Sequence, residues 1–128
     1  MKLLLDTHTL IWWLAGDDAL SQRARDAISD ENNSISVSAA SAMEVATKFR
    51  IGKLPGAELL AQDFEAIIAA QGFAELPISV SHARLAGEIN IAHKDPFDRF
   101  LIAQSQAEGM VLVSNESLFD SFALQRLW

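Results

Sequence analysis

A short apolar run near the start of the chain is closed by a carboxylate, because Leu3, Leu4 and Leu5 lead directly into Asp6. A run of this length between polar residues is typical of a strand buried on both faces of a parallel sheet. Aspartate is depleted within strands, so Asp6 marks the end of this one. Open α/β sheets place their ligands at the carboxyl ends of their strands. We therefore expect a parallel α/β fold with a functional site beside Asp6.

The rest of the chain alternates between strand-like and helix-like segments. Strands are predicted at residues 2–6, 34–38, 73–78, 110–113 and 123–128, and Pro77 indicates either an edge strand or a strand end for the third. Helices are predicted at residues 9–15, 21–28, 38–50, 57–71, 79–88 and 95–108, and a turn or short helix at 115–119. This alternation predicts a three-layer α/β/α sandwich around a central parallel sheet. Right-handed crossovers would bring the strand ends to one edge.

The length and composition indicate one ordinary globular domain over residues 1–128. Half of the residues are hydrophobic, which is enough for a single core. The chain has no cysteine, which excludes disulfides and thiolate metal sites. The three histidines, His8, His82 and His93, lack zinc-ligand spacing. The sequence shows neither a membrane-spanning run nor a secretory signal, so we expect a cytoplasmic protein.

The formal net charge of −7 does not favour binding to nucleic acid, because the phosphate backbone is also negatively charged. Either the protein avoids polyanions, or its acidity is concentrated at a metal site where a bound cation changes the local sign. A modest basic cluster occurs at Lys48, Arg50 and Lys53. It is either a phosphate-binding patch or a solvated helix end that complements the helix dipole.

Four acidic residues are candidates for a metal site at the predicted sheet edge, and each also has a structural explanation. Asp6 is either a metal ligand or a cap of the following helix. Glu44 is either a ligand or the partner of Lys48 in a helix-surface ion pair. Asp95 and Asp98 are either ligands or the N-cap and first-turn acid of a helix that begins at Pro96.

Glu116 follows the fourth predicted strand and becomes a fifth candidate if that strand lies beside the first. No competing catalytic chemistry is evident in the sequence. There is no cysteine nucleophile, no Gly-x-Ser-x-Gly elbow and no glycine-rich phosphate loop after a strand. Several carboxylates at one edge repel each other unless a divalent cation lies among them, which points to Mg²⁺ or Mn²⁺.

Together, four segments resemble the PIN domain, and within it the VapC-type ribonuclease toxins of toxin–antitoxin pairs. They are Leu-Leu-Asp-Thr-His-Thr-Leu-Ile-Trp-Trp at 4–13, Ser-Ala-Ala-Ser-Ala-Met-Glu-Val-Ala-Thr-Lys at 38–48, His-Lys-Asp-Pro-Phe-Asp-Arg-Phe-Leu-Ile-Ala-Gln at 93–104 and Val-Ser-Asn-Glu-Ser-Leu-Phe-Asp at 113–120. The resemblance implies a Mg²⁺- or Mn²⁺-dependent endoribonuclease that cuts RNA. It also implies a homodimer held by a cognate antitoxin.

The resemblance implies roles for particular residues. Asp6, Glu44 and Asp98 correspond to catalytic and metal-binding acids, with Asp95 close by. Glu116 stands where the family commonly has aspartate, so the charge is kept on a longer arm, and Ser114 matches the hydroxyl of the same loop. Arg99 and Lys48 are candidates for positioning the substrate phosphate, with a solvated surface position as the alternative for each. Trp12, Trp13 and Phe49 are candidates for the wall of an apolar groove that takes the antitoxin, and the alternative is ordinary core packing, which is expected for at least one tryptophan.

One other functional class remains open at this point, and two further classes are disfavoured by the sequence. A catalytically inactive PIN-fold module would use the same acidic pocket only to bind a basic partner protein. A phosphotransfer receiver domain would need a mid-chain strand that ends in aspartate, and no such strand is predicted. A haloacid-dehalogenase-like phosphatase would need an acid two residues after Asp6, where His8 stands.

Overall fold

The computed structural model describes residues 1–90 and 95–128 and contains one five-stranded, fully parallel sheet. The order across the sheet is β3-β2-β1-β4-β5. The strands are β1 (Lys2–Leu5), β2 (Ser34–Ser38), β3 (Ala74–Leu76), β4 (Val111–Val113) and β5 (Gln125–Leu127). The predicted α/β class is thus confirmed, and β1 lies at the centre of the sheet, as its apolar composition requires.

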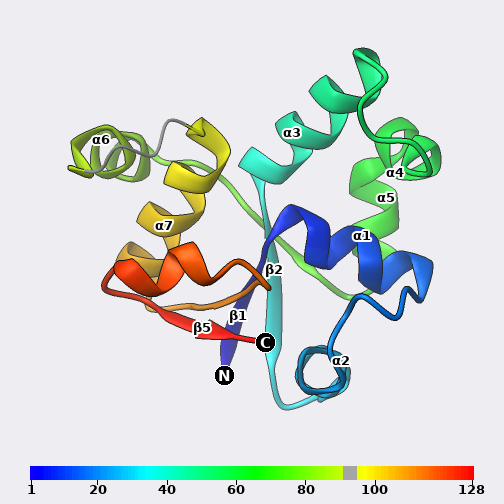
Figure 1. The fold of residues 1–128 in the computed structure, drawn as a ribbon, viewed down its shortest axis with the longest axis horizontal. Coiled ribbons are helices and arrows are strands. Elements are labelled where there is room, and N and C mark those ends of the chain that lie inside the picture. The colour runs from blue at the N-terminus through cyan, green and yellow to red at the C-terminus, as the bar shows by residue number, and fades with distance from the viewer. Residues whose placement is uncertain (91–94) are drawn as a thin grey trace.

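Helices cover both faces of the sheet, which gives the predicted three layers (Figure 1). One side carries α1 (Thr7–Ala15), α2 (Gln22–Ser29), α3 (Ala39–Arg50), α4 (Glu58–Gln62) and α5 (Phe64–Ala70). The other carries α6 (Val80–Glu88), α7 (Pro96–Glu108) and the 3-10 turn η1 (Ser117–Ser121). No helix in the described ranges is long and apolar enough to cross a membrane.

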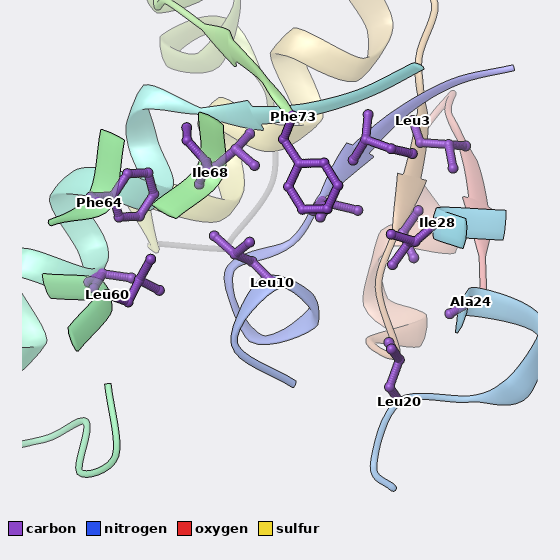
Figure 2. Packing of buried hydrophobic residues seen from close by; sticks show 14 of the residues in the cluster. Leu3, Leu10, Leu20, Ala24, Ile28, Leu60, Phe64, Ile68 and Phe73 are labelled. Carbon is purple, nitrogen blue, oxygen red and sulfur yellow. The ribbon is translucent and has the colours of Figure 1, made fainter. Parts of the chain in front are cut away.

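The side chains of β1 alternate between two hydrophobic clusters. Leu3 and Leu5 lie in the larger cluster, together with residues of α1, α2, α4 and α5 (Figure 2). Leu4 points to the opposite face and packs with Leu101 of α7 and Phe119 of η1. All three leucines have 0% exposure. Because β1 is buried on both faces, its register within the sheet is fixed, and so is the position of Asp6 at its end.

The single helix predicted at residues 57–71 is wrong, because the chain forms two helices that meet at Asp63. The backbone of Asp63 leaves the helical region, with φ −145° and ψ 49°. Its N–H still donates to the carbonyl of Leu59, and its carbonyl accepts from Ile67, so the break costs little hydrogen bonding. Aspartate is a poor helix former, and apolar periodicity alone does not reveal such a break.

Smaller differences concern the ends of elements and one side chain. Helix α1 begins at Thr7 and not at residue 9, because Asp6 caps it directly. Phe49, a candidate for a groove wall or for the core, is 36% exposed. Strand β3 is an edge strand followed by Pro77, as predicted. His93, part of the segment at 93–104, lies outside the described residues.

Candidate functional site at the carboxyl edge of the sheet

Asp6 is buried at the carboxyl end of the central strand, where only 4% of it is exposed. Its Oδ1 accepts a hydrogen bond from the backbone N–H of Thr7 at 2.7 Å, so it caps α1. Its Oδ2 accepts one from Ser114 Oγ at 2.7 Å. Burial raises the pKa of Asp6 to about 6; the two hydrogen bonds oppose this rise and the nearby charge of Glu116 adds to it.

The loop after β4 supplies the second part of the site. β4 pairs with β1, and Val113 lies beside Leu5, so this loop starts next to Asp6. Ser114 has 0% exposure and its Oγ accepts from the backbone N–H of Glu116 at 3.1 Å while it donates to Asp6. The hydroxyl therefore orients the carboxylate and the loop together. Glu116 is half-buried and close enough to raise the pKa of Asp6 through its charge.

Helix α3 supplies the third part, starting at the end of β2 on the other side of β1. Ser38 caps this helix through the N–H of Ala40. Thr7 Oγ1 donates to Ser41 Oγ at 2.9 Å, which joins the first turns of α1 and α3. Glu44 follows Ser41 by three residues, shares its helix face and is only 6% exposed. Buried acids are rare unless paired, and Glu44 pairs with Lys48.

Helix α7 brings the remaining two acids on its first turn. Asp95 is the N-cap, and its Oδ1 accepts from the N–H groups of Phe97 and Asp98. Asp98 is 9% exposed. Both carboxylates lie near Lys48. Partial burial acts to lower the pKa of Lys48, but the hydrogen bond to Glu44 and the charges of Glu44, Asp95 and Asp98 outweigh it, and the pKa is raised.

The five predicted acids thus lie in two groups at one edge, Asp6 with Glu116 and Glu44 with Asp95 and Asp98 (Figure 1 shows α3 and α7, the helices of the second group). Within residues 1–90 and 95–128, no three or more histidine or acidic side chains stand as a ready-made metal cage. The donor set nevertheless fits Mg²⁺ or Mn²⁺ in kind, since its members are carboxylate and hydroxyl oxygens without thiolate. Asp6 is buried, so its ionised form is energetically unfavourable unless a cation lies beside it.

Arg99 serves the packing of α6 on α7. Its guanidinium donates to the backbone carbonyls of Ala86, Gly87 and Ile89 at the end of α6. These bonds satisfy carbonyls that a helix end leaves open. The structure therefore gives Arg99 a scaffolding task, and Lys48 is the better placed of the two cations predicted to meet a phosphate.

A buried polar network behind the site was not anticipated from the sequence. Gln104 has 0% exposure, accepts from Ser38 Oγ at 2.5 Å and donates to the carbonyl of Pro77 at 3.2 Å. It thereby ties α7 to the cap of α3 and to the end of β3. His82 lies beside it, accepts from the N–H of Ser79 and reaches Glu108 with its other nitrogen at 2.7 Å. In the sequence, this network is indicated by Gln104, a polar residue on the apolar face of the helix predicted at residues 95–108.

The tryptophans predicted to line a groove mostly pack inward. Trp12 and Trp13 are half-buried against the larger core cluster. The ring of Trp12 also contacts that of Trp128 in a tilted arrangement, with ring centroids 5.8 Å apart, and Trp13 Nε1 donates to Gln71. An apolar hollow of about 350 Å³ does lie between α1 and the α4–α5 pair, but other residues line it, among them Ile11, Leu14 and Leu59.

Three solved structures are similar to this chain over nearly their whole length. VapBC2 from Rickettsia felis, bound to a DNA fragment from its promoter, matches with a TM-score of 0.71 at 15% identity, covering 98% of this chain and 97% of that one. DNA-bound VapBC from Salmonella typhimurium matches with a TM-score of 0.71 at 18% identity, covering 98% and 96%. A toxin–antitoxin complex from Klebsiella pneumoniae matches with 0.60 at 22%, covering 90% and 87%.

These structures establish the fold, and a sequence comparison establishes the family. A search of curated proteins finds no match. The PIN domain family matches residues 3–124, a span that includes every candidate acid of the site. With its parallel sheet and its acids at the carboxyl edge, the chain belongs to the PIN domain family.

Proposed function

We propose that this protein is a Mg²⁺- or Mn²⁺-dependent endoribonuclease and the toxin of a toxin–antitoxin pair. The observation that carries the proposal is Asp6, a buried carboxylate held by Ser114 at the end of the central strand, with the charge of Glu116 acting on it. PIN domains are generally nucleases that use divalent metals. The structural likeness to proteins found in VapBC and other toxin–antitoxin complexes supports the toxin role.

In this proposal Asp6, Glu44 and Asp98 hold the cation, with Asp95 and Glu116 completing the acidic surround. When bound, the cation would supply Lewis acidity that neutralises phosphate charge and acidifies a water molecule. Ser114 keeps Asp6 oriented and lowers the pKa of Asp6 against the effect of burial, which favours the charged form that binds a cation. The cation also allows a protein of net charge −7 to accept a polyanionic RNA.

The proposed partners are RNA as substrate, a cognate antitoxin and a second copy of the chain, all in the cytoplasm. The antitoxin fits the apolar hollow between α1 and the α4–α5 pair, where Leu59 is 77% exposed. A basic side chain from the same antitoxin would be attracted by the acids at the sheet edge.

The test is RNA cleavage by purified protein with Mn²⁺, Mg²⁺ or EDTA, beside Asp6→Asn and the exposed control Asp18→Asn. We expect cleavage that requires the metal, falls by at least about a hundredfold in Asp6→Asn and is unchanged in Asp18→Asn. Circular dichroism would show that Asp6→Asn is folded. Cleavage that persists in folded Asp6→Asn would contradict the role of Asp6.

One observation favours the alternative of an inactive PIN-fold module that binds a basic partner. Asp6 and Glu44 already have partners within the protein, Ser114 and Lys48, and the described acids do not form a ready cage. Protein that is folded, binds no Mn²⁺ by electron paramagnetic resonance and yet binds its antitoxin tightly would establish this alternative.

A further inference from the structure

Lys48 brings a positive charge into the acidic group of α3 and α7. Its Nζ lies 2.5 Å from Glu44 Oε2, and Asp95 and Asp98 act on it electrostatically from the first turn of α7. The Lys48 side chain is 31% exposed, whereas that of Glu44 is 7% exposed. The acid is therefore fixed by its surroundings, while the flexible lysine stem has solvent beside it into which it can move.

A second ion pair with the same spacing shows what an ordinary surface pair looks like in this chain. Arg84 and Glu88 also lie four residues apart, on α6, with Nη1 and Oε1 3.0 Å apart and both side chains 58% exposed. Such an exposed pair contributes little to stability. Glu44 differs because it is buried, and removing its partner would leave a buried carboxylate without compensation.

The acidic group of α3 and α7 has a net negative charge that a divalent ion could neutralise. Glu44, Asp95 and Asp98 carry three formal negative charges when ionised and Lys48 carries one positive charge, which leaves these four side chains at −2. An ammonium and a divalent cation that are both bound at the Glu44 carboxylate lie close together and repel each other. Binding of a divalent ion at Glu44 therefore weakens the hold of Lys48 on this carboxylate, and the presence of Lys48 weakens the binding of the ion.

We propose that Lys48 is the resident cation of this site: it holds Glu44 in the metal-free protein, gives way to the divalent ion and then turns to a phosphate of bound RNA. This inference rests on the proposed function and adds an exchange of cations to it. The exchange explains why a lysine lies among these acids. Lys48 compensates the negative charge of buried Glu44 until the metal ion and the RNA bind. It also gives Lys48 different partners in the two states.

The first experiment measures Mn²⁺ binding by electron paramagnetic resonance in the wild type, Lys48→Met, Lys48→Arg and Arg84→Met. We expect Lys48→Met to bind Mn²⁺ about tenfold tighter, because one opposing charge near a divalent ion is removed. Lys48→Arg, which keeps the charge, and Arg84→Met, which removes a charge elsewhere, should stay near the wild type.

The outcomes separate this inference from the proposed function. If the wild type binds Mn²⁺ and Lys48→Met binds it no more tightly, the exchange is overturned and the metal-dependent function stands. If Lys48→Met binds Mn²⁺ and the wild type does not, the exchange is supported. If neither binds Mn²⁺, the exchange and the proposed function both fail.

The second experiment needs no metal and tests the resident state in EDTA. We expect Lys48→Met to lower the melting temperature and the added substitution Glu44→Gln to restore part of the loss, because the uncompensated carboxylate is then gone. Arg84→Met with Glu88→Gln provides the matched exposed pair, for which we expect no such coupling. A Lys48→Met protein as stable as the wild type would show that Lys48 does not hold Glu44.

The third experiment tests the turn toward phosphate with a 2′-O-methyl single-stranded RNA that resists cleavage. We expect Lys48→Met to weaken binding of this RNA severalfold in Mn²⁺, where the ammonium is released to the phosphate, and to have no such effect in EDTA. An equal loss in Mn²⁺ and EDTA would overturn the exchange, since the lysine would then act in the same way in both states.

Discussion

Ser114 Oγ donates a 2.7 Å hydrogen bond to Asp6 Oδ2 across 108 residues of sequence. The bond exists because β4 is inserted beside β1, which brings the loop after one strand against the end of the other. The same hydroxyl accepts from the N–H of Glu116. Ser114 therefore links the central acid to the loop that carries the next one.

Replacing this hydroxyl should change the ionisation of Asp6. In Ser114→Ala, the hydrogen bond that lowers the pKa of Asp6 is lost, so the pKa should rise further above about 6. Stability should also fall by about 1–2 kcal/mol, because the N–H of Glu116 loses its acceptor. A ¹³C NMR titration of the Asp6 carboxyl checks the pKa, with Ser117→Ala as an exposed control from the same loop. An unchanged pKa would contradict this role of Ser114.

Asp6 should make the metal-free protein less stable as the pH rises. Its folded pKa of about 6 lies above the unfolded value of 3.8, so the folded state holds the proton longer. The contribution is fully present below the unfolded value and is lost between the two, amounting to at most about 3 kcal/mol. Urea unfolding in EDTA at pH 4 to 7 would show this loss in the wild type. Asp6→Asn should lack it, and an equal pH slope in both proteins would contradict the assignment.

The buried amide of Gln104 should matter for stability far more than its polarity suggests. Gln104→Ala should lower the free energy of unfolding by about 2–4 kcal/mol, because a cavity forms and the carbonyl of Pro77 and the hydroxyl of Ser38 lose partners. Urea denaturation measures the change. Gln106→Ala, on the exposed side of the same helix, should have little effect. A loss in Gln104→Ala no larger than in Gln106→Ala would contradict the role of the network.

Substituting Arg99 should loosen α6 and leave RNA binding unchanged. Arg99→Gln loses charged donors to three backbone carbonyls, which should cost about 2 kcal/mol. Hydrogen exchange of the α6 amides should accelerate, whereas the exposed substitution Arg84→Gln should leave these rates near the wild type. If Arg99→Gln binds the 2′-O-methyl RNA more weakly while the α6 amides stay protected, Arg99 contacts the substrate and does not serve mainly to hold α6.

Local sequence determined the central strand, most of the helix ends and the cluster of candidate acids. Three leucines before Asp6 favour a short buried strand, and Asp95-Pro96 is a strong helix start. Capping and apolar alternation depend on residues a few positions apart, so they can be read along the chain. The break at Asp63 could not, because both helices around it keep the same apolar face toward the core.

Only the tertiary structure decided what each polar side chain does. Glu44, Asp98 and Arg99 are all compatible with solvent when read locally, yet two of them are buried and the third holds the end of α6. Gln104 and Ser38 meet across 66 residues, and no local pattern contains that pairing. Burial and partners arise from the order of strands and the packing of helices over long sequence separations. The sequence by itself therefore determined which acids come to the edge of the sheet, and the packing determined which of them are compensated, by what, and at what cost in free energy.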